Sequence, residues 1–397
     1  MTNVRRRPSR RPAGRTALVC AGGGITGAVY EIGCLRALED LLDRSVLDFD
    51  AYVGVSGGAF VASLLAAGVS PAEMYEVASS PGDRSPWSDA PFFRVGLAEF
   101  ARRSLRVPGL LARAAREALS GSPPRIADLA LSLFEALPPG LLDGSGLQEY
   151  VARALARRGL ADSFDALPRA LYLVAVDLDS GEAVAFGDAA HRSVPVSRAV
   201  QASAAMPGLY RPVRIGGRDY VDGGVKKTAH INLAIRKGAD LVVCINPIVP
   251  LKNDVITGHL GSHLSEKGVT WVLDQALRIM LHGRMEYGLE RYRAEHPEVD
   301  VVVLQPTRDD LRMFRYNIMR YSARRVVAEY GYRSAREAFR RERGRYRRVF
   351  ARHGIGLRRA SSLPDVPVRL PYASDVGREL AATLGRLDGR LQERKRA

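Results

Sequence analysis

The amino-acid sequence predicts an α/β protein with a mainly parallel sheet covered by helices. Two short apolar segments, 16–21 and 52–55, have the length of buried strands, and each runs into a glycine-containing turn and then a helical pattern. Alternation of buried strands and helices indicates a parallel sheet, because parallel neighbours need a long crossover connection. The 397 residues, 46% of them apolar, are enough to bury a core of this kind.

The turns after these two strands place different residues at the start of a helix. Three consecutive glycines, residues 22–24, precede a helix predicted over 26–42, where apolar residues recur every three or four positions. The second strand ends at Ser56, and an alanine- and leucine-rich helix follows over 57–67. Both turns therefore leave backbone N–H groups at a helix N-terminus, where negative charge is stabilised.

Further strands follow a less regular insertion. Residues 80–146 are rich in proline and glycine, with helical stretches over 93–118 and 126–137, and fit either a cap over an active site or an ordinary helical insertion. Strands are predicted over 170–177, 183–186, 213–215, 241–245 and 299–304, and a helix over 196–206. We therefore predict one domain over 16–306, with its core motifs in 16–245.

Positive charge is concentrated near the two ends of the chain. The formal net charge is +16, and residues 1–15 and 333–359 contribute +6 and +9 of it, with arginine as their only cation. We predict a disordered basic tail over 1–15 and a basic helical C-terminal extension over 307–397. Such blocks are either solvated or bind an anionic surface, and the lack of a nucleic-acid motif favours a membrane surface over nucleic acid.

Cysteine spacing and hydropathy favour the cytoplasm. Cys20, Cys34 and Cys244 lie far apart in the sequence, so we expect buried free thiols in a reducing compartment. The apolar run after the basic N-terminus is too short for a signal peptide, and no run approaches the roughly 20 apolar residues that span a bilayer. The expected location is the cytoplasm, with peripheral membrane contact through the basic ends as the alternative to simple solvation.

Residues 54–58 read Gly-Val-Ser-Gly-Gly, which fits the G-x-S-x-G pattern of a nucleophile elbow. A serine on a sharp strand-to-helix turn projects its hydroxyl out of the sheet, and small neighbours let the flanking chains pass. The pattern alone is common by chance, but here it stands between an apolar strand and a helix. Ser56 is therefore the candidate nucleophile.

The earlier glycine turn is a candidate oxyanion hole. Unobstructed N–H groups of Gly22, Gly23 and Gly24 at a helix N-terminus can hold the negative charge that develops on a carbonyl oxygen. The same segment fits the G-x-G-x-x-G pattern of dinucleotide-binding folds, which expects an acidic residue at the end of the second strand to bind a ribose. That strand ends at Ser56 instead, so the oxyanion hole is the preferred interpretation.

A serine nucleophile needs a base, and an aspartate offers one. Asp222 follows the strand-like segment 218–221 and precedes two glycines, so its carboxylate should lie uncrowded at a strand end. A carboxylate can accept a serine proton if burial raises its pKa. None of the seven histidines stands in a context typical of a catalytic base, although a conventional Ser-His-Asp triad with His282 or His296 remains the alternative.

The ordered motifs GGGITG, GVSGG and DGG, with the stretch 199–212 before the aspartate, resemble the patatin-like phospholipase family over about residues 16–245. The resemblance implies a three-layer α/β/α fold and a Ser56–Asp222 dyad, with the oxyanion hole at residues 22–24 and no metal, cofactor or catalytic histidine. It also implies ester-lipid substrates, and hence a lipid acyl hydrolase of the phospholipase A, lysophospholipase or acylglycerol lipase type. A non-catalytic lipid- or protein-binding module on the same fold is the alternative from another class.

Two positions depart from the family pattern. Many members carry an aspartate before the glycines and a lysine or arginine two residues after them, where this chain has Ala21 and Thr26. The missing cation favours a neutral acyl ester over a phosphate head group at that loop. After the Asp-Gly-Gly motif, Lys226, Lys227 or His230 can supply a cation instead.

Two further features have interpretations of their own. His259 and His263 are one helical turn apart, but no glutamate follows the first histidine and no third ligand stands out, so we predict no metal site. Residues 335–350 have an apolar side and an arginine side. That pattern fits a helix on a membrane surface or, more commonly, a helix packed on the domain with its basic face exposed.

Overall fold

A sheet of eight strands, parallel over most of its width, forms the middle layer of the fold. The computed structural model describes residues 15–80, 138–253, 263–308 and 321–359, with a few isolated positions between them. The strand order is β10-β9-β1-β2-β4-β8-β7, and β5 pairs with β4 outside this path. The strands are β1 (Arg15–Cys20), β2 (Ala51–Val55), β4 (Ala170–Asp177), β5 (Ala183–Phe186), β7 (Val213–Ile215), β8 (Arg218–Asp222), β9 (Ala239–Ile245) and β10 (Asp300–Leu304).

The pairing confirms a mainly parallel sheet. β10, β9, β1, β2 and β4 are joined by parallel ladders, whereas β5, β7 and β8 pair antiparallel beside β4. Strands covered on both faces are apolar along most of their length, as β1 and β9 are. β4, β5 and β7 have the bounds predicted from the sequence, and the other predicted strands shift by one or two residues at their ends.

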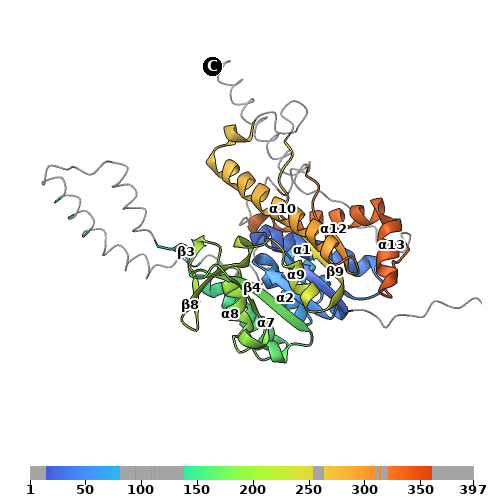
Figure 1. The fold of residues 1–397 in the computed structure, drawn as a ribbon, viewed down its shortest axis with the longest axis horizontal. Coiled ribbons are helices and arrows are strands. Elements are labelled where there is room, and N and C mark those ends of the chain that lie inside the picture. Colours follow the sequence, from blue (N-terminus) through green and yellow to red (C-terminus); the bar gives the residue numbers. More distant parts are fainter. Residues whose placement is uncertain are drawn as a thin grey trace, which may run out of the picture. The chain divides into compact units, whose positions relative to one another are not determined.

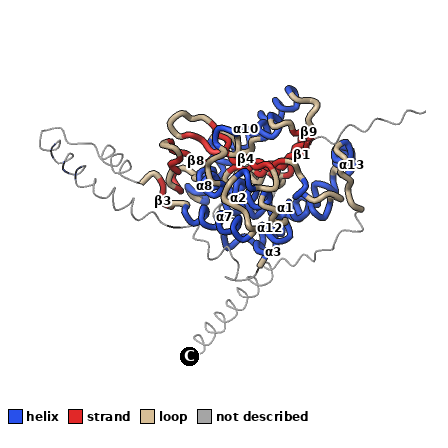
Figure 2. Tube along the Cα trace, turned by 90° about the horizontal axis from the view of Figure 1, so that it is seen from below, coloured by secondary structure: helices blue, strands red, loops and turns tan. Residues whose placement is uncertain are grey.

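Helices cover both faces of this sheet, which confirms the three-layer α/β/α arrangement. Figure 2 shows the strands as a band, with α1, α2 and α12 on one side and α10 on the other. The helices are α1 (Gly24–Leu41), α2 (Gly57–Ala66), α3 (Pro71–Ser79), α7 (Ser145–Arg157), α8 (Val196–Ser203), α9 (Ile231–Arg236), α10 (Val269–Glu295), α12 (Arg324–Arg341) and α13 (Arg343–Arg352). A separate small sheet pairs β3 (Gly140–Leu142) with β6 (Gly208–Tyr210).

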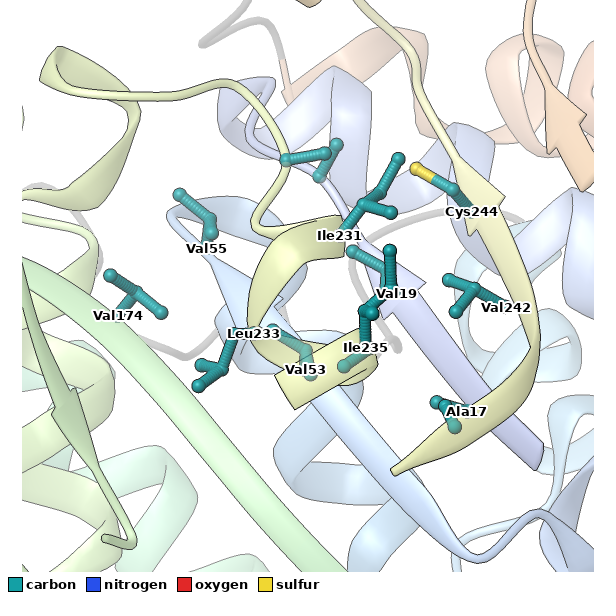
Figure 3. Packing of buried hydrophobic residues seen from close by; sticks show 14 of the residues in the cluster. Ala17, Val19, Val53, Val55, Val174, Ile231, Leu233, Ile235, Val242 and Cys244 are labelled. Carbon is teal, nitrogen blue, oxygen red and sulfur yellow. The ribbon is translucent and has the colours of Figure 1, made fainter. Parts of the chain in front are cut away.

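The short helix α9 covers the centre of the sheet on the α10 side. Its Ile231, Leu233 and Ile235 pack against valines from β1, β2, β4 and β9 (Figure 3). Met285 from α10 joins this cluster, so the C-terminal half of α10 is anchored over the sheet. Full burial of each such side chain contributes about 1.5–3 kcal/mol.

On the other face, α1 and α12 pack closely, although they are far apart in the sequence (Figure 1). A Cβ at Gly33 would lie 2.1 Å from the Ala328 carbonyl oxygen, and one at Gly331 would lie 2.2 Å from the Tyr30 carbonyl oxygen. Both positions need glycine because backbone from the opposite helix occupies the space of a side chain. The two helices therefore meet backbone to backbone.

The C-terminal helices belong with the sheet. The compact unit of the chain continues to Leu357, so the structure divides the chain after that residue and not at the expected boundary at 307. The apolar sides of α12 and α13 are buried, with Phe339 and Phe350 at 1% and 0% exposure. The apolar side of 335–350 is thus used for packing within the domain, which leaves the arginines on the outer side.

Several other expectations can be compared with the structure. Arg15 begins β1 and so is not part of a tail, while residues 1–14 and the predicted helical stretches 93–118 and 126–137 lie almost entirely outside the described residues. The helix expected over 196–206 ends at Ser203. The three cysteines are buried and unpaired, as expected. Within the described ranges, no helix combines the length and hydropathy needed to cross a bilayer.

We predict that Gly33→Ala destabilises the chain by about 1–3 kcal/mol, because the added methyl group forces α1 and α12 apart. Gly283→Ala in α10 is the matched control, since a Cβ there meets no atom within 4 Å. Helix propensity predicts that the control gains up to about 1 kcal/mol. Urea unfolding followed by circular dichroism measures both variants, and equal stability of Gly33→Ala and the wild type would contradict the packing argument.

Candidate active site

The sheet register places Ser56 and Asp222 at the same height on either side of β4. Val55, the last residue of β2, is level with Val174 of β4, so Ser56 follows at the level of Ala175. Ala175 is in turn level with Asp222, the last residue of β8. β8 runs antiparallel to β4 and starts at the edge where β2 ends, and its pairing with β4 stops at Ala175, so its last residue is still level with the end of β2. The fold thus brings the two predicted residues together.

Ser56 has the strained backbone of a nucleophile elbow. Its φ of 55° makes it the single non-glycine residue with positive φ in the described part of the chain. The turn is possible because its neighbours have no side chains: a Cβ at Gly57 would lie 2.2 Å from the Gly24 carbonyl oxygen, and one at Gly58 would lie 2.4 Å from that of Cys20. A backbone of this kind costs roughly 1–3 kcal/mol and persists where the surroundings enforce it.

The Asp222 carboxylate is buried and only partly hydrogen-bonded. The Gly224 N–H donates to Oδ1 at 2.7 Å, whereas Oδ2 has no hydrogen-bond partner among the described residues. Burial raises the pKa of Asp222 to about 6, although the nearby Ser56 hydroxyl and the Gly224 N–H oppose that rise. The Ser56 hydroxyl is therefore close enough to the carboxylate to stabilise its ionised form. Catalytic hydrogen bonds often tighten only when substrate binds.

The end of α8 connects the backbones of both residues. Ser203 Oγ accepts a hydrogen bond from the Ser56 N–H at 3.1 Å and donates one to the Val174 carbonyl at 2.6 Å. Two residues later, the Ala205 carbonyl accepts a hydrogen bond from the Asp222 N–H at 2.9 Å. Ser203 therefore ties the serine turn to β4, a role that the sequence analysis did not assign. In the sequence, the one feature that pointed to Ser203 was its position within the stretch 199–212.

The glycine turn lies next to Ser56, but its amides are not equivalent. The Gly22 N–H donates to the Thr228 carbonyl at 3.1 Å and is therefore already engaged. Gly23 caps α1 and Gly24 is its first residue, and neither N–H has a hydrogen-bond partner among the described residues. The expected row of three free amides is reduced to Gly23 and Gly24, at the positive end of the α1 dipole.

A cavity of about 410 Å³ contains Ser56, Asp222, Gly22 and Gly23. Its volume is that of a site for a small molecule or an acyl chain. Apolar side chains form most of the wall: Met206, Pro207, Val225, Ile248, Leu277, Met280 and Leu281. The cavity can therefore hold a hydrocarbon chain beside a nucleophile and a carboxylate.

Much of this wall comes from α10, a helix that was not predicted from the sequence. Besides apolar residues, α10 contributes Asp274, Arg278 and Arg284 to the cavity. Arg278 is buried and pairs with Asp274 at 2.8 Å, one helical turn away. A motif search misses such residues because their contribution depends on where a long helix crosses the sheet.

No histidine of the described residues lines this cavity. His282 Nε2 pairs with Glu286 at 3.0 Å, and His296 pairs with Glu298 at 3.3 Å. His230 is buried with its Nε2 3.5 Å from the Gly223 carbonyl oxygen, and its pKa is lowered to about 4, first of all by burial. The described geometry therefore gives no support to a Ser-His-Asp triad.

Comparison with known proteins adds an independent observation. The family model described as Patatin-like phospholipase matches residues 18–235. Uncharacterised NTE family proteins of Mycobacterium bovis and Mycobacterium tuberculosis are 26% identical over 239 residues, which is 60% of this chain. The match covers 31% of those relatives, so the chain spans about a third of their length.

Two solved structures are also similar to this chain. VipD from Legionella pneumophila has 15% identity and a TM-score of 0.38, with coverage of 83% of this chain and 67% of VipD. The type III effector ExoU, which the solved complexes attribute to Pseudomonas aeruginosa, has 14% identity and a TM-score of 0.36. That comparison covers 82% of this chain and 52% of ExoU.

We predict that Asp222→Asn raises the free energy of unfolding at pH 8 by about 2–3 kcal/mol, the value of its pKa shift. Because the folded pKa of about 6 exceeds the ordinary 3.8, the wild type loses stability as pH rises through this interval. The advantage of the variant should disappear below about pH 4, where the carboxyl is protonated in both states. Denaturant unfolding across this pH range measures the effect.

Asp219→Asn is the control on the same strand. Its carboxylate pairs with Arg214, which holds the pKa of Asp219 below its ordinary value. That substitution should therefore give no gain in stability at pH 8. An Asp222→Asn variant less stable than the wild type at pH 8 would show that the buried charge is compensated.

Proposed function

Because the chain belongs to the patatin-like phospholipase family, we propose that it is a lipid acyl hydrolase with Ser56 as nucleophile and Asp222 as base. One observation supports these two roles above all others: a strained serine lies beside a buried carboxylate of raised pKa, within a largely apolar cavity. Perturbed carboxylates in clefts are common at catalytic sites. Lipid hydrolysis is the general activity of the family, whereas the residue roles and the substrate are our proposal.

In the first half of the proposed reaction, Ser56 Oγ attacks the ester carbonyl carbon while Asp222 accepts the hydroxyl proton. The carbonyl oxygen becomes an oxyanion beside the N–H groups of Gly23 and Gly24. When the tetrahedral intermediate collapses, the bond to the alcohol oxygen breaks and Asp222 returns its proton to that oxygen. The alcohol or lysolipid leaves, and the acyl group remains on Ser56.

In the second half, water attacks the acyl-enzyme and gives a proton to Asp222. Collapse of the second intermediate breaks the bond to Ser56 Oγ, which recovers the proton, and the fatty acid is released. Asp222 thus serves as acid and base in turn, which suits a carboxyl whose pKa lies close to neutrality. Oδ2, which has no hydrogen-bond partner among the described residues, is the oxygen available for this proton.

The route of the lipid to Ser56 follows the N-terminal half of α10. Leu277 and Met280 line the cavity and are also 40% and 56% exposed. Val269, Val272 and Leu273 continue the same helix face and are exposed as well. Because this exposed apolar face is continuous with the cavity wall, we propose that it contacts the surface of lipid bilayers.

We predict that Ser56→Ala abolishes ester hydrolysis and that Asp222→Asn lowers kcat by at least about a hundredfold, the scale of general-base catalysis. Hydrolysis of p-nitrophenyl butyrate and release of fatty acid from phospholipid vesicles measure the change. Asp219→Asn and His282→Gln should keep activity, and loss of activity in His282→Gln alone would favour the triad. Failure of a fluorophosphonate to label Ser56 in the wild type would favour a non-catalytic binding module.

The pH dependence of the wild type gives a separate test. Asp222 must be deprotonated to accept the serine proton, so kcat/KM should rise with pH and level off above about pH 7. With a pKa of about 6, the rate at pH 5 should be roughly tenfold below the plateau. A rate that falls as pH rises from 5 to 7 is inconsistent with Asp222 as base.

For the lipid surface, we predict that Leu273→Asp reduces sedimentation of the chain with phospholipid vesicles. The added charge must be dehydrated if the α10 face enters the bilayer interface. Leu178→Asp is the control, since Leu178 is also exposed but follows β4, outside α10. Equal loss of vesicle binding in both variants would show that the effect does not depend on α10.

A further inference from the structure

A second cavity, of about 460 Å³, adjoins the one at Ser56 and is lined by basic residues. Thr228 and Arg284 line both cavities, so the two share part of a wall. The basic cavity is formed by the loop after β8, by α9 and by the C-terminal half of α10. Its charged members are Lys226, Lys227, Arg236, Arg284, Arg291 and Glu295.

Three of these cations have no carboxylate partner in the described part of the chain. Lys227 Nζ lies 3.2 Å from the Tyr292 hydroxyl, and Arg284 donates to the Val225 carbonyl at 2.9 Å. Arg236 is exposed beside them and makes no ion pair with another described residue. The other two cations are paired, Lys226 with Glu182 and Arg291 with Glu295.

The effect of the cavity's positive charges can be seen on His230, a buried residue close to them. His230 is buried behind the loop and has its pKa lowered to about 4, mainly by burial and further by the charges of Lys227, Arg236 and Lys226. The Gly223 carbonyl opposes this shift. Three cations of the cavity thus make the electrostatic potential at His230 more positive. A positive potential favours an anionic ligand over a neutral one.

We propose that the basic cavity binds the head group of the substrate lipid and selects head groups with net negative charge over zwitterionic ones. The inference rests on the proposed function, because it places the ester at Ser56 and the phosphate beyond Arg284. A phosphate in the cavity would accept charge-assisted hydrogen bonds from Lys227, Arg236 and Arg284. The ammonium group of a zwitterionic lipid would lie among the same cations, where like charges repel.

In this proposal, the positive charge that binds the head group comes from the basic cavity and not from the glycine turn. Thr26 stands where many family members have a lysine or arginine, and this difference favours a neutral ester at the turn itself. The basic cavity supplies positive charge from other elements, the loop after Asp222, α9 and α10. The expectation of a neutral ester thus concerns the glycine turn alone, and the proposed head-group site concerns the rest of the lipid.

The binding test uses Ser56→Ala protein, so that no lipid is consumed. Dihexanoylphosphatidylglycerol and dihexanoylphosphatidylcholine are matched probes that share acyl chains and phosphate and differ in net charge. Titration calorimetry should show binding of the anionic lipid at least about tenfold tighter, and adding Lys227→Gln with Arg236→Gln should remove most of that preference. Arg293→Gln, on α10 but outside both cavities, should leave the preference unchanged.

Two results would overturn the proposal. One is equal affinity for the two lipids. The other is a preference that survives the double substitution. Glycerol 3-phosphate serves as a third probe, and affinity equal to that of the anionic lipid would identify a site for a free phosphate ester instead of a head group.

A kinetic arm separates this inference from the proposed function. In protein with an intact Ser56, the double variant should lower the ratio of kcat/KM for phosphatidylglycerol to kcat/KM for p-nitrophenyl butyrate by about tenfold or more. An unchanged ratio overturns the head-group site while hydrolysis by Ser56 stands. Failure of the wild type to hydrolyse either ester refutes the proposed function, and the calorimetric comparison still decides whether the cavity prefers anionic lipids.

Discussion

The central constraint on this structure is a buried carboxylate, Asp222, that is held beside a serine and whose Oδ2 has no hydrogen-bond partner among the described residues. A carboxylate in such a place is costly, and its raised pKa is a direct expression of that cost. β4 fixes the lateral spacing between the two residues. The end of α8 holds both of their backbones, and the glycines around Ser56 allow α1 and α2 to begin within contact of the turn.

The two faces of the sheet contribute differently to the site. On one face, α1 supplies the amides at its N-terminus and is locked against α12 by direct backbone contact. On the other face, α10 is anchored through Met285 and extends an apolar, exposed half toward the cavity. The amides of the proposed oxyanion hole thus belong to the tightly packed helix α1, while the proposed lipid-contacting wall is carried by a helix whose first half is largely exposed.

The sequence predicts the centre of this fold well because the centre is locally encoded. Buried parallel strands leave continuous apolar runs, and the elbow at Ser56 requires small residues at fixed spacing, so both features can be found without a structure. Asp222 could be singled out because two glycines follow it at a strand end. These features predicted a mainly parallel α/β sheet, and the family resemblance that rests on the same motifs implied the three-layer fold and the pairing of Ser56 with Asp222.

Other features depend on tertiary position and could not be found in the same way. The N–H group of Gly22 donates a hydrogen bond to the Thr228 carbonyl, and this contact can be found only in the structure. The apolar cavity and the basic cavity share α10, whose residues show no motif and gain meaning from where the helix crosses the sheet. The compact unit continues past the expected boundary at 307 to Leu357, because α12, which was assigned to a basic extension, packs against α1.

The raised pKa of Asp222 makes its protonation sensitive to the surface charge of a lipid bilayer. A bilayer leaflet that contains anionic lipid, such as the cytoplasmic leaflet, has a surface potential of about −30 mV, which concentrates protons near the head groups by roughly threefold. For a chain seated on such a surface, the carboxyl near pKa 6 would be half protonated at a bulk pH about half a unit higher than in free solution. For the proposed reaction, in which Asp222 must be deprotonated, lipid composition would then adjust the fraction of molecules able to begin turnover.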